Sequence, residues 1–441
     1  MSSQPARFLK LLVLLVLVVM GGLACINGVV DPWGLYHWYS KDGFNAHKPR
    51  QIFNERIIRA SDINREHPDV LLMGTSRAQV GLSPDAPAVK NLTQHALNVG
   101  FSDGTAYEAL RYLQHAHAQS PVKVAIIGAD FLSFSGATRK SADFTEERLA
   151  VTADFQRQWM YRLADVPNTL LSLDALRASR RTTLEQYLPS YFYPGGRRNE
   201  HTMAARIEEQ GGMHGTFMWS EHDYLREYAC FRPFSTAYDK GGGSIGGWKN
   251  QLAVTDKGSG AMEDFRTLVT FARQQGITLY VYTSPSHVRS QVLVEQAGLW
   301  PQYEAWKAEL VAVLAANHTP LWEFGGADPR FTAEALPAKG DTTSRMKWYW
   351  ESSHFRRELG DVALERILGA PERDETRGFG VPLTLANVEQ ELQRVKREIT
   401  TWQAEHPDEL KEMTAQATTV FATERAKCPA GEPVMKQAPK L

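Results

Sequence analysis

The sequence carries almost no net charge and few cysteines. Lys and Arg number 49 and Asp and Glu number 50, which gives a formal net charge of -1 over 441 residues. Nucleic-acid-binding proteins usually present a basic surface, so this balance gives no indication of nucleic-acid binding. Three cysteines are too few for a disulfide-rich scaffold. With 43% hydrophobic and 22% charged residues, the composition is that of an ordinary globular protein.

The pairing of the three cysteines is left open by the sequence. Cys25 lies inside an apolar run, which leaves Cys230 and Cys428 as a possible pair. Sequence gives no distance between them, so they either form a disulfide or stay reduced.

Long apolar runs are also scarce, and the one present is near the N-terminus. Residues 11–30 contain no charge and, at about 1.5 Å per residue, are long enough to cross a hydrocarbon core of about 30 Å. Arg7 and Lys10 precede this run and Asp31 follows it, so the positive-inside rule predicts a cytoplasmic start and an exported body. We expect a transmembrane signal anchor at 8–30, with a cleaved signal peptide or a lipoprotein-like cleavage box as alternatives.

After a juxtamembrane segment at 31–67, the pattern is typical of an α/β domain at 68–372. Short apolar runs predict buried strands, and apolar residues at helical spacing follow several of them. This alternation favours crossover connections and a parallel sheet. The expected strands are 69–74, 122–128, 277–282 and 320–324, and the expected helices are centred on 106–117, 265–272, 306–314 and 355–367.

Two segments depart from this alternation. Residues 133–260 are rich in Arg, Glu and Tyr, and we interpret them as a long insertion or lid between sheet strands. Residues 373–441 form a C-terminal extension with a narrow apolar stripe from Val388 to Trp402. That stripe is too short for a stable coiled coil alone, so we expect it to pack on the body rather than to dock a partner.

Three short motifs carry residues suited to nucleophilic catalysis. Ser76 follows the first expected strand in a Gly-Thr-Ser-Arg sequence, where its hydroxyl is either a nucleophile or a plain helix cap. Asn98 and Gly100 fit either a loop that approaches substrate or a simple turn. Glu351 lies three residues before His354, close enough to orient an imidazole that removes the serine proton, although His354 is alternatively structural.

Taken together, these motifs resemble the SGNH (GDSL-like) hydrolase superfamily. The likeness is greatest to its membrane-anchored branch, which includes alginate-acetylation and D-alanylation-associated proteins. It rests on the anchor, the Gly-Thr-Ser-Arg, Asn-Val-Gly, Gly-Ala-Asp-Phe (128–131) and Glu-Ser-Ser-His-Phe (351–355) motifs, and spans about 70–368. The resemblance implies a three-layer parallel sheet of the SGNH or flavodoxin-like type, in a protein of the bacterial inner membrane whose body is periplasmic.

The resemblance also implies roles for individual residues. Ser76 would be the nucleophile, His354 the base and Glu351 its carboxylate partner, with Gly100, Asn98 and Arg77 at the oxyanion or substrate. Asp130 stands where the wider family has an oxyanion Asn, and a carboxylate cannot donate a hydrogen bond unless it is protonated. We therefore expect Asp130 to orient another group, or Arg77 to supply positive charge.

These expectations define an acyl-transfer hypothesis and a rival. The first is O-acetylation or deacetylation of an extracellular or cell-wall polysaccharide through an acyl-Ser76 enzyme, with no cofactor and with a membrane-bound acyltransferase as a possible partner. The rival is a non-catalytic polysaccharide-binding or assembly protein on a degenerate scaffold. No metal is expected, because His115 and His117 are two residues apart and point to different faces of a helix.

Overall fold

The computed structural model describes residues 4–135, 141, 143–231 and 260–428. The expected insertion therefore lies partly outside the described residues, at 136–140, 142 and 232–259, as do residues 429–441 of the expected C-terminal extension. The chain divides into two compact units, one formed by Met1–Glu66 and Asp143–Pro194 and the other by His67–Ala142 and Gly195–Leu441. The boundaries differ from the expected ones, because the first part of the insertion joins the N-terminal segment instead of the sheet domain.

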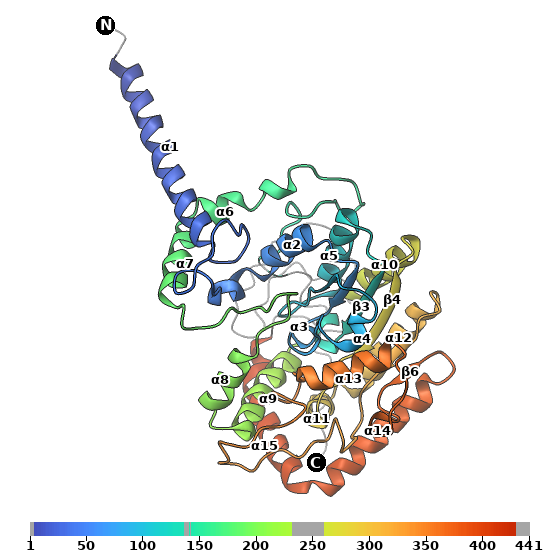
Figure 1. The fold of residues 1–441 in the computed structure, drawn as a ribbon. Helices are drawn as coiled ribbons and strands as arrows, with labels where there is room; N and C mark the ends of the chain where they lie inside the picture. Colours follow the sequence, from blue (N-terminus) through green and yellow to red (C-terminus); the bar gives the residue numbers. More distant parts are fainter. Residues whose placement is uncertain (1–3, 136–140, 142, 232–259, 429–441) are drawn as a thin grey trace. The chain divides into compact units, whose positions relative to one another are not determined.

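The first unit is helical in its described part (Figure 1). Its longest element, α1, is the one described helix that is long and apolar enough to cross a membrane. Its elements are α1 (Gln4–Val30), η1 (Pro49–Asn54), α2 (Glu55–Glu66), η3 (Tyr161–Leu163), α6 (Val166–Leu170) and α7 (Leu173–Leu184).

The second unit is built on a six-stranded sheet in the order β2-β1-β3-β4-β5-β6. Neighbouring strands from β2 to β5 pair in parallel, whereas β6 pairs antiparallel with β5. The expected α/β class with a mostly parallel sheet is thus confirmed. The strands are β1 (Val70–Met73), β2 (Ala96–Asn98), β3 (Val124–Ala129), β4 (Thr278–Thr283), β5 (Leu321–Glu323) and β6 (Val381–Leu383).

Helices cover both faces of this sheet. On one face Leu72, Ile126 and Tyr282 pack in a single apolar cluster with residues of α3, α4 and α13. On the other face Ile127 lies near α5 and α10. The helices of this unit are α3 (Ser76–Gly81), α4 (Pro87–Lys90), α5 (Ala106–Gln119), η2 (Phe131–Phe134), α8 (His201–Glu209), α9 (Met213–Ala229), α10 (Ala261–Gln274), α11 (Val288–Gln296), α12 (Trp300–Ala315), α13 (Arg357–Ile367), η4 (Asp374–Thr376), α14 (Val388–Glu405), α15 (Pro407–Glu424) and η5 (Arg425–Lys427).

The four strands expected from apolar runs are present as β1, β3, β4 and β5. The strands β2 and β6 were not expected, because each has only three residues and β6 contains Pro382, which an edge strand tolerates. The stripe from Val388 to Trp402 forms α14, which packs on α11, α12 and α15 of its own unit as expected.

Helix α9 is held to the C-terminal helices by a disulfide and a buried ion-pair network. Cys230 at the end of α9 is bonded to Cys428 after α15, which answers the question that the sequence left open. Arg289 on α11 is fully buried and donates to both carboxylate oxygens of Glu221, at 2.7 and 2.8 Å, and to Glu409 at 2.9 Å. The network therefore joins α9, α11 and α15.

We expect Arg289→Ala to destabilise the second unit by about 3–5 kcal/mol, because it leaves the Glu221 carboxylate buried without its partner. Arg377→Ala is the control, since Arg377 and its partner Asp374 are exposed and such pairs contribute little. The measurement is urea unfolding followed by circular dichroism. Equal midpoints for the two variants would show that the Arg289 network is not a major source of stability.

Candidate active site

Ser76 is placed by a tight turn at the carboxyl end of β1. Gly74 has φ of 142°, and a Cβ there would lie 3.0 Å from the Ala78 Cβ and 3.1 Å from the Gly128 carbonyl oxygen, so the turn needs glycine. Thr75 caps α3 by accepting the Arg77 N–H at 3.3 Å. The helix-cap role that Ser76 might have had is therefore filled by Thr75.

His354 reaches Ser76 from the loop that precedes α13. The distance from His354 Nε2 to Ser76 Oγ is 2.8 Å. On the other side of the ring, Nδ1 is hydrogen-bonded to Glu351 Oε1, which also accepts the His354 backbone N–H at 2.8 Å. An ionised carboxylate can only accept, so Nδ1 carries the proton and Nε2 is free to accept from the Ser76 hydroxyl. The structure thus brings Ser76, His354 and Glu351 together in the order expected of a Ser–His–carboxylate triad.

The Glu351 carboxylate is buried but well satisfied. Oε2 accepts the Ser353 N–H at 3.0 Å and Oε1 lies 3.1 Å from Ser353 Oγ. Burial raises the pKa of Glu351, but the attraction of His354 and hydrogen bonds from His354, Ser220 and the Ser353 backbone outweigh it and bring the pKa to about 2. The Glu351 carboxylate is therefore ionised at neutral pH.

Tyr224 on α9 extends this group of hydrogen bonds, and sequence reasoning missed it. Its hydroxyl is hydrogen-bonded to Ser353 Oγ, which in turn contacts Glu351. Burial raises the pKa of Tyr224 well above its usual value, so the phenol stays protonated. The Tyr224 hydroxyl thus lies behind the Glu351 carboxylate, with the Ser353 hydroxyl between the two. No motif signals this role, since α9 lies in the segment interpreted as an insertion.

Glu227 lies on the same face of α9, less than one helical turn beyond Tyr224. Burial and then the charge of Asp103 raise the pKa of Glu227 to about 8, so most of this carboxyl is protonated at neutral pH. Asp103 belongs to the loop after Gly100, so the charge that helps to raise the pKa of Glu227 comes from that loop.

Arg77 and Asp130 form an ion pair beside the triad. Asp130 accepts from Arg77 Nη1 at 2.9 Å and from Thr75 Oγ1 at 2.5 Å. Burial lowers the pKa of Arg77, but the attraction of Asp130 outweighs it and the pKa lies above its usual value, so Arg77 is charged. Its guanidinium also lies 5.6 Å from the centre of the Tyr224 ring. Asp130 is thus a hydrogen-bond acceptor that orients Thr75 and Arg77. Orienting another group is one of the two roles that the sequence analysis considers for Asp130.

Asn98 and Gly100 both pack against α3 and hydrogen-bond inside the protein. Asn98 is fully buried, and its Nδ2 donates to the carbonyl oxygens of Ala78 at 2.9 Å and Leu82 at 2.8 Å. Its Oδ1 accepts the Gly100 N–H at 2.9 Å. A Cβ on Gly100 would lie 2.7 Å from the Gln79 nitrogen, so close packing on α3 explains the glycine. Asn98 braces α3 instead of facing substrate, and the Gly100 N–H is already donated inside the protein.

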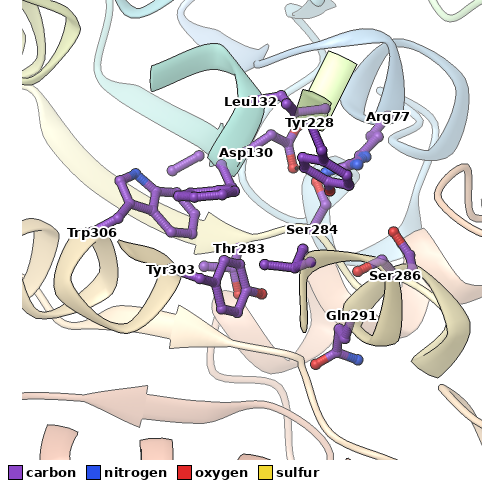
Figure 2. A pocket seen from close by; sticks show the side chains of 14 residues that line it. Arg77, Asp130, Leu132, Tyr228, Thr283, Ser284, Ser286, Gln291, Tyr303 and Trp306 are labelled. Atoms are coloured by element: carbon purple, nitrogen blue, oxygen red, sulfur yellow. Dashed lines mark hydrogen bonds and ion pairs between the residues drawn. The ribbon is translucent and has the colours of Figure 1, made fainter. Parts of the chain in front are cut away.

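A narrow polar cavity lies beyond the Arg77–Asp130 pair, at the carboxyl ends of β3 and β4. Figure 2 shows Arg77, Asp130 and Tyr228 on one side of it and Ser286 and Gln291 on another. It has room for about one or two water molecules. Neither Ser76 nor His354 lines it, so it is a neighbour of the triad and not the place where a scissile bond would lie.

Comparison with known proteins adds no assignment to this geometry. No protein-family model, no curated protein and no solved structure matches the chain.

We expect the Glu351 carboxylate to make folding pH-dependent in acid. Its pKa falls from an ordinary 4.5 to about 2 on folding, so its contribution to stability is present above pH 4.5 and is lost as the pH falls toward 2. The contribution is about 3 kcal/mol for a shift of this size. Unfolding by urea between pH 6 and pH 2.5 should show a steeper loss for the natural chain than for Glu351→Gln. Parallel curves would contradict this assignment.

Proposed function

We propose that the protein is an acyl-transfer enzyme that works through an acyl-Ser76 intermediate. The observation that carries this proposal is the 2.8 Å contact between His354 Nε2 and Ser76 Oγ, with the ionised Glu351 on the opposite ring nitrogen. A serine at the start of a helix, a histidine within hydrogen-bond reach and a carboxylate that fixes the tautomer are the parts that nucleophilic catalysis by serine needs.

The proposed reaction has two steps. His354 Nε2 takes the Ser76 proton as Oγ attacks an ester carbonyl, and the imidazolium then returns that proton to the departing alkoxide. An acceptor hydroxyl is next deprotonated by His354 and attacks the acyl-serine carbonyl, and the imidazolium protonates Ser76 Oγ as the acyl–oxygen bond breaks. Glu351 stabilises the imidazolium in both steps. The acceptor decides the outcome, since a sugar hydroxyl gives O-acylation and water gives hydrolysis.

Few of the described backbone or side-chain donors near Ser76 are available to stabilise an oxyanion. In the described part of the chain, the Ser76 N–H donates no hydrogen bond and is available to an oxyanion. The Gly100 N–H is donated to Asn98, and Asp130 accepts where a donor would be useful. Charged Arg77 is the remaining nearby source of positive potential.

The substrate class rests on the resemblance of the sequence to the membrane-anchored SGNH branch. We propose acetyl transfer to or from an extracellular or cell-wall polysaccharide, at the periplasmic side of a bacterial inner membrane. A membrane-bound acyltransferase that delivers the acetyl group fits the transferase form of this proposal. A non-catalytic polysaccharide-binding role is the second candidate, and the acceptor character of Asp130 together with the occupied Gly100 N–H favours it.

We expect Ser76→Ala to lower hydrolysis of an acetyl-ester reporter by about 10³-fold or more, because the variant lacks the hydroxyl that carries the acyl group in this proposal. The acetyl content of the polysaccharide in cells should fall if the protein adds acetyl groups and rise if it removes them. Ser120→Ala, at the end of α5, is the control. Unchanged values in both assays with a folded Ser76→Ala protein would decide for the non-catalytic role.

Tyr224→Phe should reduce kcat/KM by about 3- to 10-fold, the effect of losing one hydrogen bond behind the carboxylate. Because Tyr224 acts through Ser353, Ser353→Ala should give a loss of similar size, and the double variant should lose little more. Tyr187→Phe is the control, since that ring is 80% exposed. Additive losses in the double variant would show that the two hydroxyls act separately.

A further inference from the structure

The end of α1 is built into the first unit instead of projecting from it. Asn27, Gly28 and Val30 are buried, whereas nearly all earlier side chains of α1 are exposed. Asn27 Nδ2 donates to the Leu170 carbonyl oxygen at 2.9 Å, and Ser179 Oγ lies 2.9 Å from Asn27 Oδ1. Figure 1 shows α6 and α7 at this end of α1. These contacts fix the position of the unit along the helix.

The length of the exposed part of α1 sets where a membrane surface would lie. From Phe8 to Ile26 the helix is about 28 Å long at about 1.5 Å per residue, close to a hydrocarbon thickness of about 30 Å. Lys10 near its start can extend toward the headgroups. If α1 spans the bilayer, Asn27 and the residues bonded to it therefore lie at the interface.

Exposed apolar side chains outside α1 are concentrated in this unit. Among the described residues, the larger second unit has only Leu92, Trp219 and Leu385 of this kind. The first unit, although much smaller, holds all the others, which are Trp38, Tyr39, Ile52, Phe53, Trp159, Met160, Leu163, Leu173, Leu184, Tyr187 and Tyr193. Exposed apolar residues scattered singly are ordinary, but a concentration of this kind marks an interaction surface.

Several of these side chains lie near the buried end of α1. The Trp38 ring covers Gly28, where a Cβ would come within 2.0 Å of it, yet Trp38 stays 59% exposed. Leu173 follows Leu170, the residue bonded to Asn27, by three positions and is 63% exposed. Trp and Tyr are enriched at membrane interfaces because their rings have an apolar body and a polar edge.

The segment before α6 adds a second apolar group with basic neighbours. Trp159 is 84% exposed, and Met160 and Leu163 are also exposed. Arg157 and Arg162 are exposed within the same short segment. An apolar group flanked by arginines suits a bilayer surface with anionic headgroups better than it suits water.

We propose that the first unit is a membrane-interface platform, in which Trp38, Trp159, Met160, Leu163 and Leu173 enter the headgroup region of the bilayer that α1 spans. The occupant of this apolar surface is lipid with anionic headgroups. The proposal rests on α1 being kept as an anchor and is independent of the chemistry at Ser76. Insertion of these side chains together with α1 holds the first unit at one depth in the membrane surface.

The test measures immersion of single spin labels in the full chain. Cys25→Ser removes the free thiol, and the Cys230–Cys428 disulfide leaves no other reactive cysteine. Trp159→Cys, Leu163→Cys and Leu173→Cys are labelled one at a time and reconstituted in vesicles of phosphatidylcholine and phosphatidylglycerol. Collisions with oxygen, which dissolves in lipid, are compared with collisions with a water-soluble nickel chelate. Leu385→Cys is the control, because Leu385 is 65% exposed in the second unit.

We expect nickel collisions at the three platform positions to be several-fold fewer than at Leu385, with oxygen collisions higher. Equal nickel access at all four positions would overturn the proposal. Low collision rates with both reagents would also overturn it, since they would place these side chains in a protein contact. Repeating the labels in Ser76→Ala separates the two proposals, because immersion should be unchanged there. The intact mass of chain extracted from cells shows whether α1 is retained.

Discussion

Among the buried charges of the second unit, the carboxylate of Glu351 is the one on which the geometry around Ser76 and His354 depends. A carboxylate removed from water is costly unless every oxygen is paired or hydrogen-bonded. Here the partners come from three places, namely the His354 ring, the backbone of its own loop and hydroxyls that lead to α9. Satisfying Glu351 therefore fixes the tautomer of His354 and the position of α9 at the same time.

The short distance between Ser76 and His354 depends on how their two loops are supported. The loop of His354 is closed by the Tyr349–Phe355 bridge, and the Trp350 N–H donates to the His354 carbonyl oxygen at 2.9 Å. The Phe355 ring packs directly on Gly81 at the end of α3, where a Cβ would lie 2.0 Å from it. Since Ser76 begins the same helix, the contact of Phe355 with Gly81 sets the approach of the imidazole to the hydroxyl. The phenylalanine after the histidine is thus part of the geometry of the site.

The sequence was informative where burial follows a simple pattern. Strands β1, β3, β4 and β5 are short apolar runs. Ser76, Glu351 and His354 can be predicted as candidate site residues because a serine, a carboxylate and a histidine each suit one task in nucleophilic catalysis. The role of α9 could not be read in the same way. Its buried Glu221 and half-buried Tyr224 have the residue types of a solvated helix, and only their partners Arg289 and Ser353, distant in sequence, explain their burial. The sequence leaves the roles of Asn98 and Gly100 open for a related reason, since packing on α3 and exposure to substrate both favour these residues.

The Arg77–Asp130 pair shows how a carboxylate can be accommodated next to Ser76. An unpaired carboxylate there would oppose the negative charge that develops on an oxyanion. Paired with Arg77 and accepting from Thr75, Asp130 is neutralised, and it holds the turn that presents Ser76. The cost is electrostatic, because a neutral ion pair stabilises an oxyanion less than a dedicated donor would. Under the acyl-transfer proposal, transition-state stabilisation therefore depends on the Ser76 N–H, with Arg77 as the nearby source of positive potential.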